Sequence, residues 1–386
     1  MRILFFTIEY LEGAGQSANI TDIANFLRKY SSRDYKLTLM TNSYTADTKY
    51  SDSFDEILIN SGNYLDIVRT IRNASKDYDV IYFKNGIQYL QLMRNIKTPL
   101  VFVLHGPDPT FFTIYNKGVL TKYNSRIKTH IANFLQTPFF LKNADALVTV
   151  SPVVWSYYNN RFNIETLMIP DVFDFEVICK APPNRVSSDG PVFLNVGDWD
   201  GFDGKKRTHE IVLTFKHYLK EHTNAKLCLV GIKTYFDKLK QFVDDLNISE
   251  NVIIIGKVTA ETLFGLYKGA DIFVSATVSE GFYRPLIEAF SAGTPAIVRD
   301  TSSFVSEVNL AHVYHIKKSG GGELYDGSPS SFANVADHIL AQRKLYSERA
   351  IEYAKKFDYH QIMPKYVELF DKLEKKKEKL VKGGKT

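Results

Sequence analysis

The sequence has few cysteines, no long apolar run and no strong imbalance of charge. Its two cysteines, Cys179 and Cys228, form no close-spaced metal or redox pair, which favours a reducing cytosol. No apolar run approaches the ~20 residues that span a bilayer, so we expect any membrane contact to be peripheral. The apolar run at residues 3–8 is too short for a secretory signal and is expected to form the first strand.

The small net charge and the absence of repeats argue against a nucleic-acid-binding protein and a solenoid. The net charge of +5 is too small to indicate a nucleic-acid partner, and we expect none. The positive residues are nevertheless uneven, because lysines concentrate at the C-terminus. No repeat of fixed period is present, which excludes a solenoid. The remaining composition, 45% hydrophobic and 24% charged, is that of an ordinary globular protein.

The length and the pattern of apolar runs predict two α/β domains. A chain of 386 residues exceeds the ~250–300 residues at which single cores stop growing. Apolar runs alternate with helical patterns throughout, as in parallel sheets with crossover helices. The expected strands lie near 2–8, 36–41, 55–59, 79–83, 99–104 and 145–150, and then near 191–197, 225–231, 251–256, 271–275, 295–298 and 312–316.

The boundary between the domains is expected at a stretch rich in proline, serine and glycine. This stretch, residues 180–191, indicates a linker, which we place at 171–189. The N-terminal domain is then 1–170 and the C-terminal domain 190–358. A last helical pattern, from about Tyr359 onwards, carries an apolar stripe through Tyr366, Phe370 and Leu373.

The most informative segment is 279–289, which sets Glu280 and Glu288 eight positions apart. An apolar strand pattern precedes it, and Pro285 marks the first turn of a helix. In a parallel sheet this loop lies at the carboxyl edge, where a helix N-terminus attracts a phosphate. Glu288, one turn into the helix, can reach hydroxyl groups of a ligand held there. Either glutamate alone is as well explained as a helix-terminal charge.

This segment resembles the E-x7-E signature of family-4 retaining glycosyltransferases, which have the GT-B fold. The resemblance extends over nearly the whole chain, through segments 143–151, 194–197, 227–231 and 252–256. It implies two Rossmann-like, doubly wound domains that face a central cleft, with residues 359–386 crossing back to the N-terminal domain. It also implies that Glu288 binds the ribose of a nucleoside diphosphate sugar and that Glu280 lies near the transferred sugar.

The same resemblance predicts a phosphate site after the strand that ends at Gly197. The family places an arginine just after this glycine and a lysine at the next helix start. Lys206 corresponds to that lysine, but Asp198 stands in place of the arginine. Lys205, Arg207 or Arg284 could supply the second charge. The alternative is an ordinary solvated basic helix start.

The signature loop departs from the family in a second way. Tyr283 and Arg284 stand where the family has a glycine and an apolar residue. We nevertheless expect Gly281, Phe282, Tyr283 and Arg284 to line the substrate site.

Two further candidates belong to the N-terminal half. Gly15 lies in a loop that faces donor and acceptor in the resembling family, although the dinucleotide fingerprint is incomplete. His105 follows an apolar strand, and the family has a histidine there, near the donor sugar. His105 is as well explained as a packed turn residue by the sequence alone. No serine and aspartate accompany it in a hydrolase triad.

We expect no metal and no cofactor other than the donor substrate. Asp198 and Asp200 match a bare Asp-x-Asp pattern beside the expected diphosphate, and they form the metal-dependent alternative. Lysine charge and the helix dipole are expected to do what a cation would.

The expected activity is therefore hexosyl transfer with retention of configuration, to a glycan or lipid-linked acceptor. The expected place is the cytoplasm, with peripheral membrane contact if the acceptor is lipid-linked. Two alternatives stay open: a GT-B nucleotide-sugar epimerase and a non-catalytic sugar-nucleotide binding protein.

Overall fold

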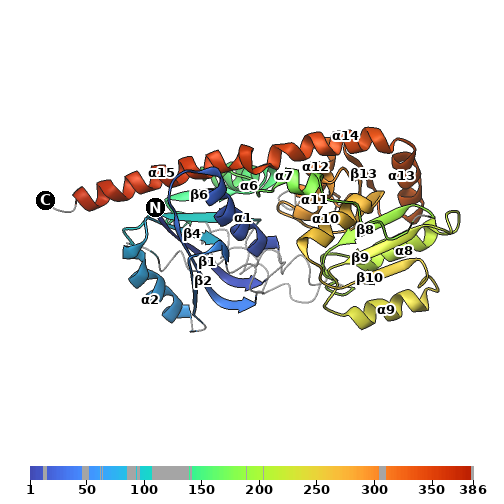
Figure 1. Ribbon diagram of the computed structural model, residues 1–386, viewed down its shortest axis with the longest axis horizontal. Helices are drawn as coiled ribbons and strands as arrows, with labels where there is room; N and C mark the ends of the chain where they lie inside the picture. The colour runs from blue at the N-terminus through green and yellow to red at the C-terminus, as the bar shows by residue number, and fades with distance from the viewer. Residues whose placement is uncertain are drawn as a thin grey trace. The chain divides into compact units, whose positions relative to one another are not determined.

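The chain forms two compact units. The structure, a computed structural model, describes residues 1–11, 15–45, 52–60, 62, 64–84, 93, 96–106, 139, 141–187, 189–202, 204–303 and 310–383. Among the described residues, unit 1 comprises those up to 173 and those from 359 onwards, and unit 2 comprises those from 174 to 358. The chain thus enters unit 2 at residue 174 and returns to unit 1 at residue 359 (Figure 1).

Unit 1 contains a parallel sheet of seven strands in the order β3-β2-β1-β4-β5-β6-β7. The strands are β1 (Arg2–Leu11), β2 (Lys36–Thr45), β3 (Glu56–Ile59), β4 (Val80–Lys84), β5 (Leu100–Leu104), β6 (Ala146–Thr149) and β7 (Leu167–Met168). The order reverses direction between β1 and β4, which makes the sheet doubly wound. The two-residue strand β7 was not predicted, because so short a pairing leaves no alternation in the sequence.

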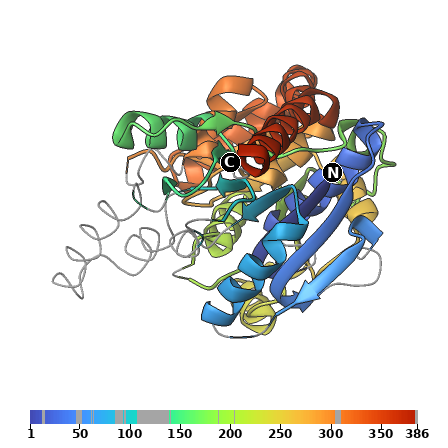
Figure 2. The ribbon, with the colours of Figure 1, turned by 90° about the vertical axis from the view of Figure 1, so that its left-hand side faces the viewer.

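Helices cover both faces of this sheet (Figure 2). They are α1 (Gly15–Tyr30), α2 (Tyr64–Ala74), α6 (Pro152–Phe162) and α15 (Tyr359–Gly383). Successive side chains along a strand point to opposite faces of the sheet, so each face has its own hydrophobic core. Leu4 and Phe83 pack in the cluster that contains residues of α2 and α6. On the other face, Tyr82 meets Tyr366 and Phe370 of α15 at ring distances of 6.2 and 6.3 Å.

Unit 2 contains a parallel sheet of six strands in the order β10-β9-β8-β11-β12-β13. The strands are β8 (Val192–Val196), β9 (Lys226–Val230), β10 (Val252–Ile255), β11 (Ile272–Ser275), β12 (Ala296–Arg299) and β13 (Gly322–Tyr325). Its helices are α7 (Phe175–Cys179), α8 (Thr208–Tyr218), α9 (Phe236–Asp245), α10 (Ala260–Gly269), α11 (Arg284–Ser291), α12 (Ala311–Ser319), α13 (Pro329–Ala341) and α14 (Arg343–Ala354). Here the order reverses between β8 and β11, so their carboxyl ends flank the switch point.

One prediction of local structure needs correction, and one segment contains a helix that was not expected. The strand expected at 312–316 is helix α12, which ends at Gly320 in the left-handed conformation (φ 61°), and the strand follows at β13. The buried residues His312, Val313, His315 and Ile316 have the spacing of a helix, whereas the short run His-Val-Tyr-His-Ile, with its β-branched and aromatic residues, is of a composition typical of strands. The segment expected as a linker, 171–189, contains helix α7, whose N-cap Asp174 accepts from the Val177 amide.

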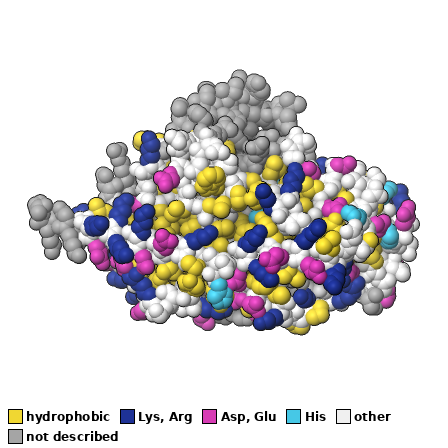
Figure 3. All heavy atoms as spheres, turned by 90° about the horizontal axis from the view of Figure 1, so that it is seen from above, with side chains coloured by type: hydrophobic (Ala, Val, Ile, Leu, Met, Phe, Trp, Pro, Cys, Tyr) yellow, Lys and Arg dark blue, Asp and Glu magenta, His cyan; other side chains and the backbone are white. Residues whose placement is uncertain are grey.

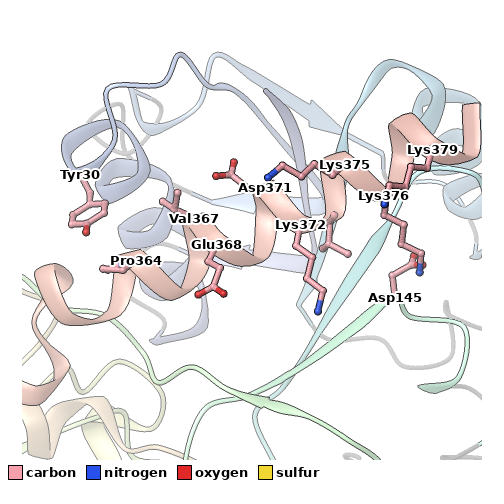
Figure 4. A pocket seen from close by; sticks show the side chains of 11 residues that line it. Tyr30, Asp145, Pro364, Val367, Glu368, Asp371, Lys372, Lys375, Lys376 and Lys379 are labelled. Carbon is pink, nitrogen blue, oxygen red and sulfur yellow. The ribbon is translucent and has the colours of Figure 1, made fainter. Parts of the chain in front are cut away.

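Helix α15 completes the core of unit 1. Met363, Tyr366, Phe370 and Leu373 are buried along one side of it. Beside this helix, a pocket of about 860 Å³ is lined by lysines and acidic residues together with Tyr30, Pro364, Val367 and Leu373 (Figure 4). Lysine and arginine side chains are mixed with acidic ones on the face that Figure 3 shows. Among the described residues, none of the helices is both long and apolar enough to cross a membrane.

Candidate active site

The site in unit 2 is built on the loops after β8 and β11, at the switch point of the sheet. The first loop carries Lys205 and Lys206, and the second carries Glu280. A backbone bond from Val278 N–H to the Lys205 carbonyl (3.0 Å) joins the two loops. Gly197 (φ 148°) ends β8, and a Cβ there would lie 3.6 Å from Cε of Lys206. The strand ends thus bring together residues that lie 75 positions apart.

Two lysines form ion pairs with one buried carboxylate where the two loops meet. Lys205 Nζ lies 2.9 Å from Glu280 Oε2, and Lys206 Nζ lies 2.9 Å from Oε1. The side chain of Glu280 is 11% exposed and those of the lysines are 27% exposed. Thr277 Oγ1 also donates to Glu280 Oε1 at 2.9 Å. The arrangement is a partly exposed cluster with two positive charges and one negative charge.

Burial and ion pairing set the charge of this cluster. Burial alone would raise the pKa of Glu280, but the charges and hydrogen bonds of both lysines outweigh it and lower that pKa to about 2. Burial lowers the pKa of Lys205, partly offset by the attraction of Glu280. For Lys206 burial acts in the same sense, but attraction by Glu280 prevails and its pKa is raised. Glu280 is therefore an anion at neutral pH.

Asp200 shapes the loop that presents the lysines. Its carboxylate accepts from the backbone N–H of Lys205 (2.6 Å) and of Lys206 (3.2 Å). A Cβ at Gly204 would lie 2.0 Å from Asp200 Oδ1, so only glycine fits there. Asp200 thus acts on the backbone and lies outside the ion-pair cluster.

Asp198, which replaces the expected arginine, also binds backbone. Its Oδ1 accepts from the N–H groups of Lys233 (2.8 Å) and Thr234 (2.9 Å), and its Oδ2 accepts from Thr234 Oγ1 (2.6 Å). This carboxylate ties the loop after β8 to the loop after β9. Within the residues that the structure describes, no group of three or more His, Cys, Asp or Glu side chains could hold a metal ion.

Glu288 lies one turn into α11 in a second charged group. Tyr267 of α10 donates its hydroxyl to Glu288 Oε2 at 3.1 Å. Arg284 Nη2 lies 3.6 Å from Glu288 Oε1. Both charged side chains are largely buried, at 11% and 14% exposure. The contacts hold the carboxylate near the start of α11. The backbone N–H groups at this end of the helix favour an anion.

The three candidates for the second positive charge at the phosphate site have different partners. Arg284 contacts Glu288, and Arg207 pairs with Glu210 at 2.6 Å. Lys205 alone of the three shares Glu280 with Lys206. These contacts make Lys205 the residue best placed to act with Lys206.

Two residues of the signature loop face inward. Phe282 is 4% exposed and packs its ring on His315 and Phe357, each at 5.3 Å. Tyr283 is also 4% exposed and lies beneath Lys206. Both side chains are thus buried against protein groups, and contact of this loop with a substrate stays a prediction. Gly281 lies between them and Glu280 in the chain.

The remaining predicted residues belong to unit 1. Gly15 begins α1, and His105 directly follows β5, so both lie at the carboxyl edge of that sheet. Residues 111–123 combine aromatics with lysines, a composition that suits a packed helix or an acceptor or lipid-headgroup surface, and they lie outside the described residues.

Sequence reasoning missed several residues of the site. Tyr267 lies 21 positions before Glu288, and Ser275, Thr277 and His312 carry no spacing signal. His312 is fully buried below the signature loop, where its Nε2 is 3.0 Å from Thr301 Oγ1. The first N–H of α12, at Ala311, donates to the Glu280 carbonyl at 3.1 Å. Only the three-dimensional packing of α10 and α12 reveals these contacts.

Comparison with known proteins relates this geometry to a family. Residues 181–357, which contain all of the unit 2 site, match the family model of glycosyl transferases group 1. The alpha-monoglucosyldiacylglycerol synthase of Streptococcus pneumoniae is 22% identical over 287 residues. That alignment covers 71% of this chain and 63% of the relative, so the chain spans less than two thirds of the relative's length.

Solved structures share the whole architecture. Sucrose-phosphate synthase from Thermosynechococcus elongatus superimposes with a TM-score of 0.74 at 16% identity, covering 97% of this chain and 99% of that one. HepE from Anabaena, solved in complex with UDP and glucose, gives a TM-score of 0.73 at 17% identity and covers 96% and 99%. The chain therefore has the predicted GT-B fold, and its residues 181–357 are similar to glycosyl transferases group 1.

Proposed function

We propose that this protein is a retaining glycosyltransferase that moves a hexose from a nucleoside diphosphate sugar to a glycan or lipid-linked acceptor. The observation that carries the proposal is the Lys205–Glu280–Lys206 cluster beside the N-terminus of α11. Two ammonium groups and a helix N-terminus together suit a diphosphate. Relationship to group 1 glycosyltransferases and to structures solved with UDP and UDP-glucose supports the same donor class.

Each residue of the unit 2 site has a place in this proposal. Glu288, oriented by Tyr267 and Arg284, accepts hydrogen bonds from the ribose hydroxyls. Lys206 and Lys205 neutralise the diphosphate. Glu280 holds both lysines in place and borders the transferred sugar. His105 and Gly15 of unit 1 contribute to binding of the sugar and the phosphates.

Retention follows from attack on the face that the leaving group occupies. The acceptor hydroxyl oxygen bonds to the anomeric carbon while the bond from that carbon to the diphosphate oxygen breaks. The hydroxyl proton passes to a phosphate oxygen of the leaving group. Negative charge then grows on the diphosphate, so the lysines stabilise the transition state more than the ground state.

The acceptor class and the location rest on relatives. The relative from Streptococcus pneumoniae is named as a synthase of a glycosylated diacylglycerol, and another from Campylobacter jejuni acts, by its name, on a diphospho-undecaprenol. Lipid-linked acceptors are reached at a membrane surface. We therefore place this protein in the cytoplasm, with peripheral contact to the membrane.

The proposal is tested with a panel of nucleoside diphosphate sugars and acceptors, with release of the nucleoside diphosphate as the signal. The anomeric configuration of the product is read from its NMR coupling constant. Inversion would contradict the mechanism. An altered donor sugar in the absence of acceptor would indicate the epimerase alternative. Binding without transfer or slow donor hydrolysis would indicate the non-catalytic alternative.

We further propose that transfer needs no metal. Both Asp198 and Asp200 are bound to backbone N–H groups, which leaves them poorly placed to coordinate a cation. EDTA should leave the transfer rate within about twofold of the untreated rate. Loss of activity with EDTA that Mg²⁺ or Mn²⁺ restores would assign Asp198 and Asp200 to a metal site instead.

A further inference from the structure

Tyr283 has an unusual backbone for its size. It precedes α11 with φ 75° and ψ 65°, in the left-handed region that favours glycine. A bulky side chain there costs free energy that a glycine would not, and such strain persists only where the surrounding structure supports it. The position is the N-cap of the helix that the donor phosphates are proposed to meet.

The side chain of Tyr283 is fixed from several sides. Its hydroxyl donates to Ser275 Oγ at 2.6 Å, at the end of β11. Its ring centre lies 6.2 Å from that of Phe273 and 6.3 Å from that of His312. With 4% exposure it has almost no surface of its own to offer a ligand.

One face of the ring supports a lysine. Lys206 Nζ lies 5.2 Å from the ring centre, while Glu280 Oε1 holds the same ammonium at 2.9 Å. A cation within about 6 Å of an aromatic face is attracted by the negative charge of that face. The ammonium is therefore held between a carboxylate and an uncharged ring.

We infer that Tyr283 is the positioning residue for Lys206, fixing its ammonium at the start of α11 for a diphosphate. This inference rests on the proposed function and adds to it the residue through which the lysine is held. A bound diphosphate would contact the same Lys206 ammonium as Glu280 does. The negative charge of that carboxylate would therefore repel the diphosphate. The ring holds the ammonium without that repulsion, because it carries no formal charge. The strained backbone places this ring, which a glycine could not supply.

The test is the affinity for inorganic pyrophosphate, measured by calorimetry on the full chain. Tyr283→Phe keeps the ring and should bind within about twofold of the wild type. Tyr283→Leu keeps apolar bulk without the ring and should bind roughly 2- to 30-fold more weakly, the range of cation–π contacts. Tyr283→Asn, which tolerates the left-handed backbone, should show a similar loss.

A double-mutant cycle separates support of Lys206 from general packing. In a Lys206→Met background, Tyr283→Leu should cause no further loss of pyrophosphate affinity. Tyr325→Leu is the matched control, because it removes an equally buried tyrosine from β13 of the same unit. It should lower the melting temperature and leave pyrophosphate affinity unchanged.

The outcomes distinguish this inference from the proposed function. If Tyr283→Phe loses as much affinity as Tyr283→Leu, or if the losses multiply in the double variant, Tyr283 does not act through Lys206. If Lys206→Met itself binds pyrophosphate as the wild type does, the phosphate site fails, and the proposed function fails with it.

Discussion

At the scale of single residues, Glu288 is oriented by two partners before any ligand binds. Tyr267 and Arg284 each contact one of its oxygens. We predict that Glu288→Ala weakens binding of the preferred nucleoside diphosphate roughly 10- to 100-fold, because hydrogen bonds to a charged group contribute about 1.5–3 kcal/mol. Calorimetry measures this loss, with Glu221→Ala on the exposed surface as the control. Unchanged affinity would remove Glu288 from the ribose site.

The two lysines should carry most of the leaving-group stabilisation. We predict that Lys206→Ala lowers kcat ~10²–10³-fold, as loss of a positioned donor to a developing anion does. Lys205→Ala should cause a loss of similar size, whereas Arg284→Ala should act mainly on nucleotide affinity through Glu288. Steady-state kinetics with saturating donor separates the two effects.

The opposite pattern has a defined meaning. A large loss of kcat in Arg284→Ala together with normal turnover in Lys205→Ala would assign the second charge to Arg284. Full activity in all three variants would show that the diphosphate binds elsewhere.

The sequence identified the charged residues of this site better than their surroundings. Glu280 and Glu288 were singled out because a strand, a glycine turn and a helix start leave a local pattern, whereas Lys206 was singled out through the family resemblance. Asp198 could not be understood from the sequence, since its partners Lys233 and Thr234 lie in the next loop. These partners are set by which strands are neighbours in the sheet.

At the scale of elements, helix α12 makes unit 2 sensitive to acid. Burial lowers the pKa of His312 to about 3 and that of His315 to about 4. The charged groups Glu280, Lys205 and Lys206 face His312, and His315 lies on the same helix. Above pH 6.5, the ordinary pKa of histidine, these side chains are neutral in the folded and in the unfolded chain, so they do not change the stability. As the pH falls below it, only the unfolded chain gains protons, so the free energy of unfolding falls.

We therefore predict that His312→Asn reduces this dependence on pH. The loss in free energy of unfolding between pH 7.5 and pH 5.5 should shrink by about 1 kcal/mol relative to the wild type. Urea unfolding at both pH values measures it, and the comparison between pH values cancels any uniform loss of stability. An equal pH dependence in both proteins would show that His312 is not held neutral.

The elements also show where pattern reading succeeds. The strands with five or more apolar or alternating residues were predicted within a few positions. Helix α12 was predicted as a strand. Its buried residues include two histidines and cover more of the helix surface than a single apolar stripe. Burial on several sides removes the period that distinguishes the two structures.

At the scale of the whole molecule, lysines of α15 differ in the contacts that they make. Lys376 and Lys377 pair with Asp145 and Asp79 of unit 1. Lys372, Lys375 and Lys379 line the pocket beside the helix, together with Lys376 (Figure 4).

We predict that replacing Lys372, Lys375 and Lys379 by glutamine weakens binding to anionic vesicles by about 1 kcal/mol per lysine. Co-sedimentation measures it, and these substitutions leave the ion pairs of the helix intact, which a deletion would not. The control replaces Lys216, Lys220 and Lys240, which are exposed on unit 2. No binding by the wild type, or equal binding by both variants, would mean that the lysines serve only solubility.

Helix α15 belongs to the core of unit 1 yet is synthesised after unit 2. On the ribosome, β1 to β7 emerge first, but Tyr82 lacks the cover of Tyr366 and Phe370 until about 185 further residues have been translated. At roughly 5–20 residues per second this delay lasts about 10–40 s. The sheet and helices of unit 2 all lie within residues 174–358 and can fold during that time. The N-terminal unit should therefore finish folding second, with an apolar sheet face that a chaperone could shield in the interval.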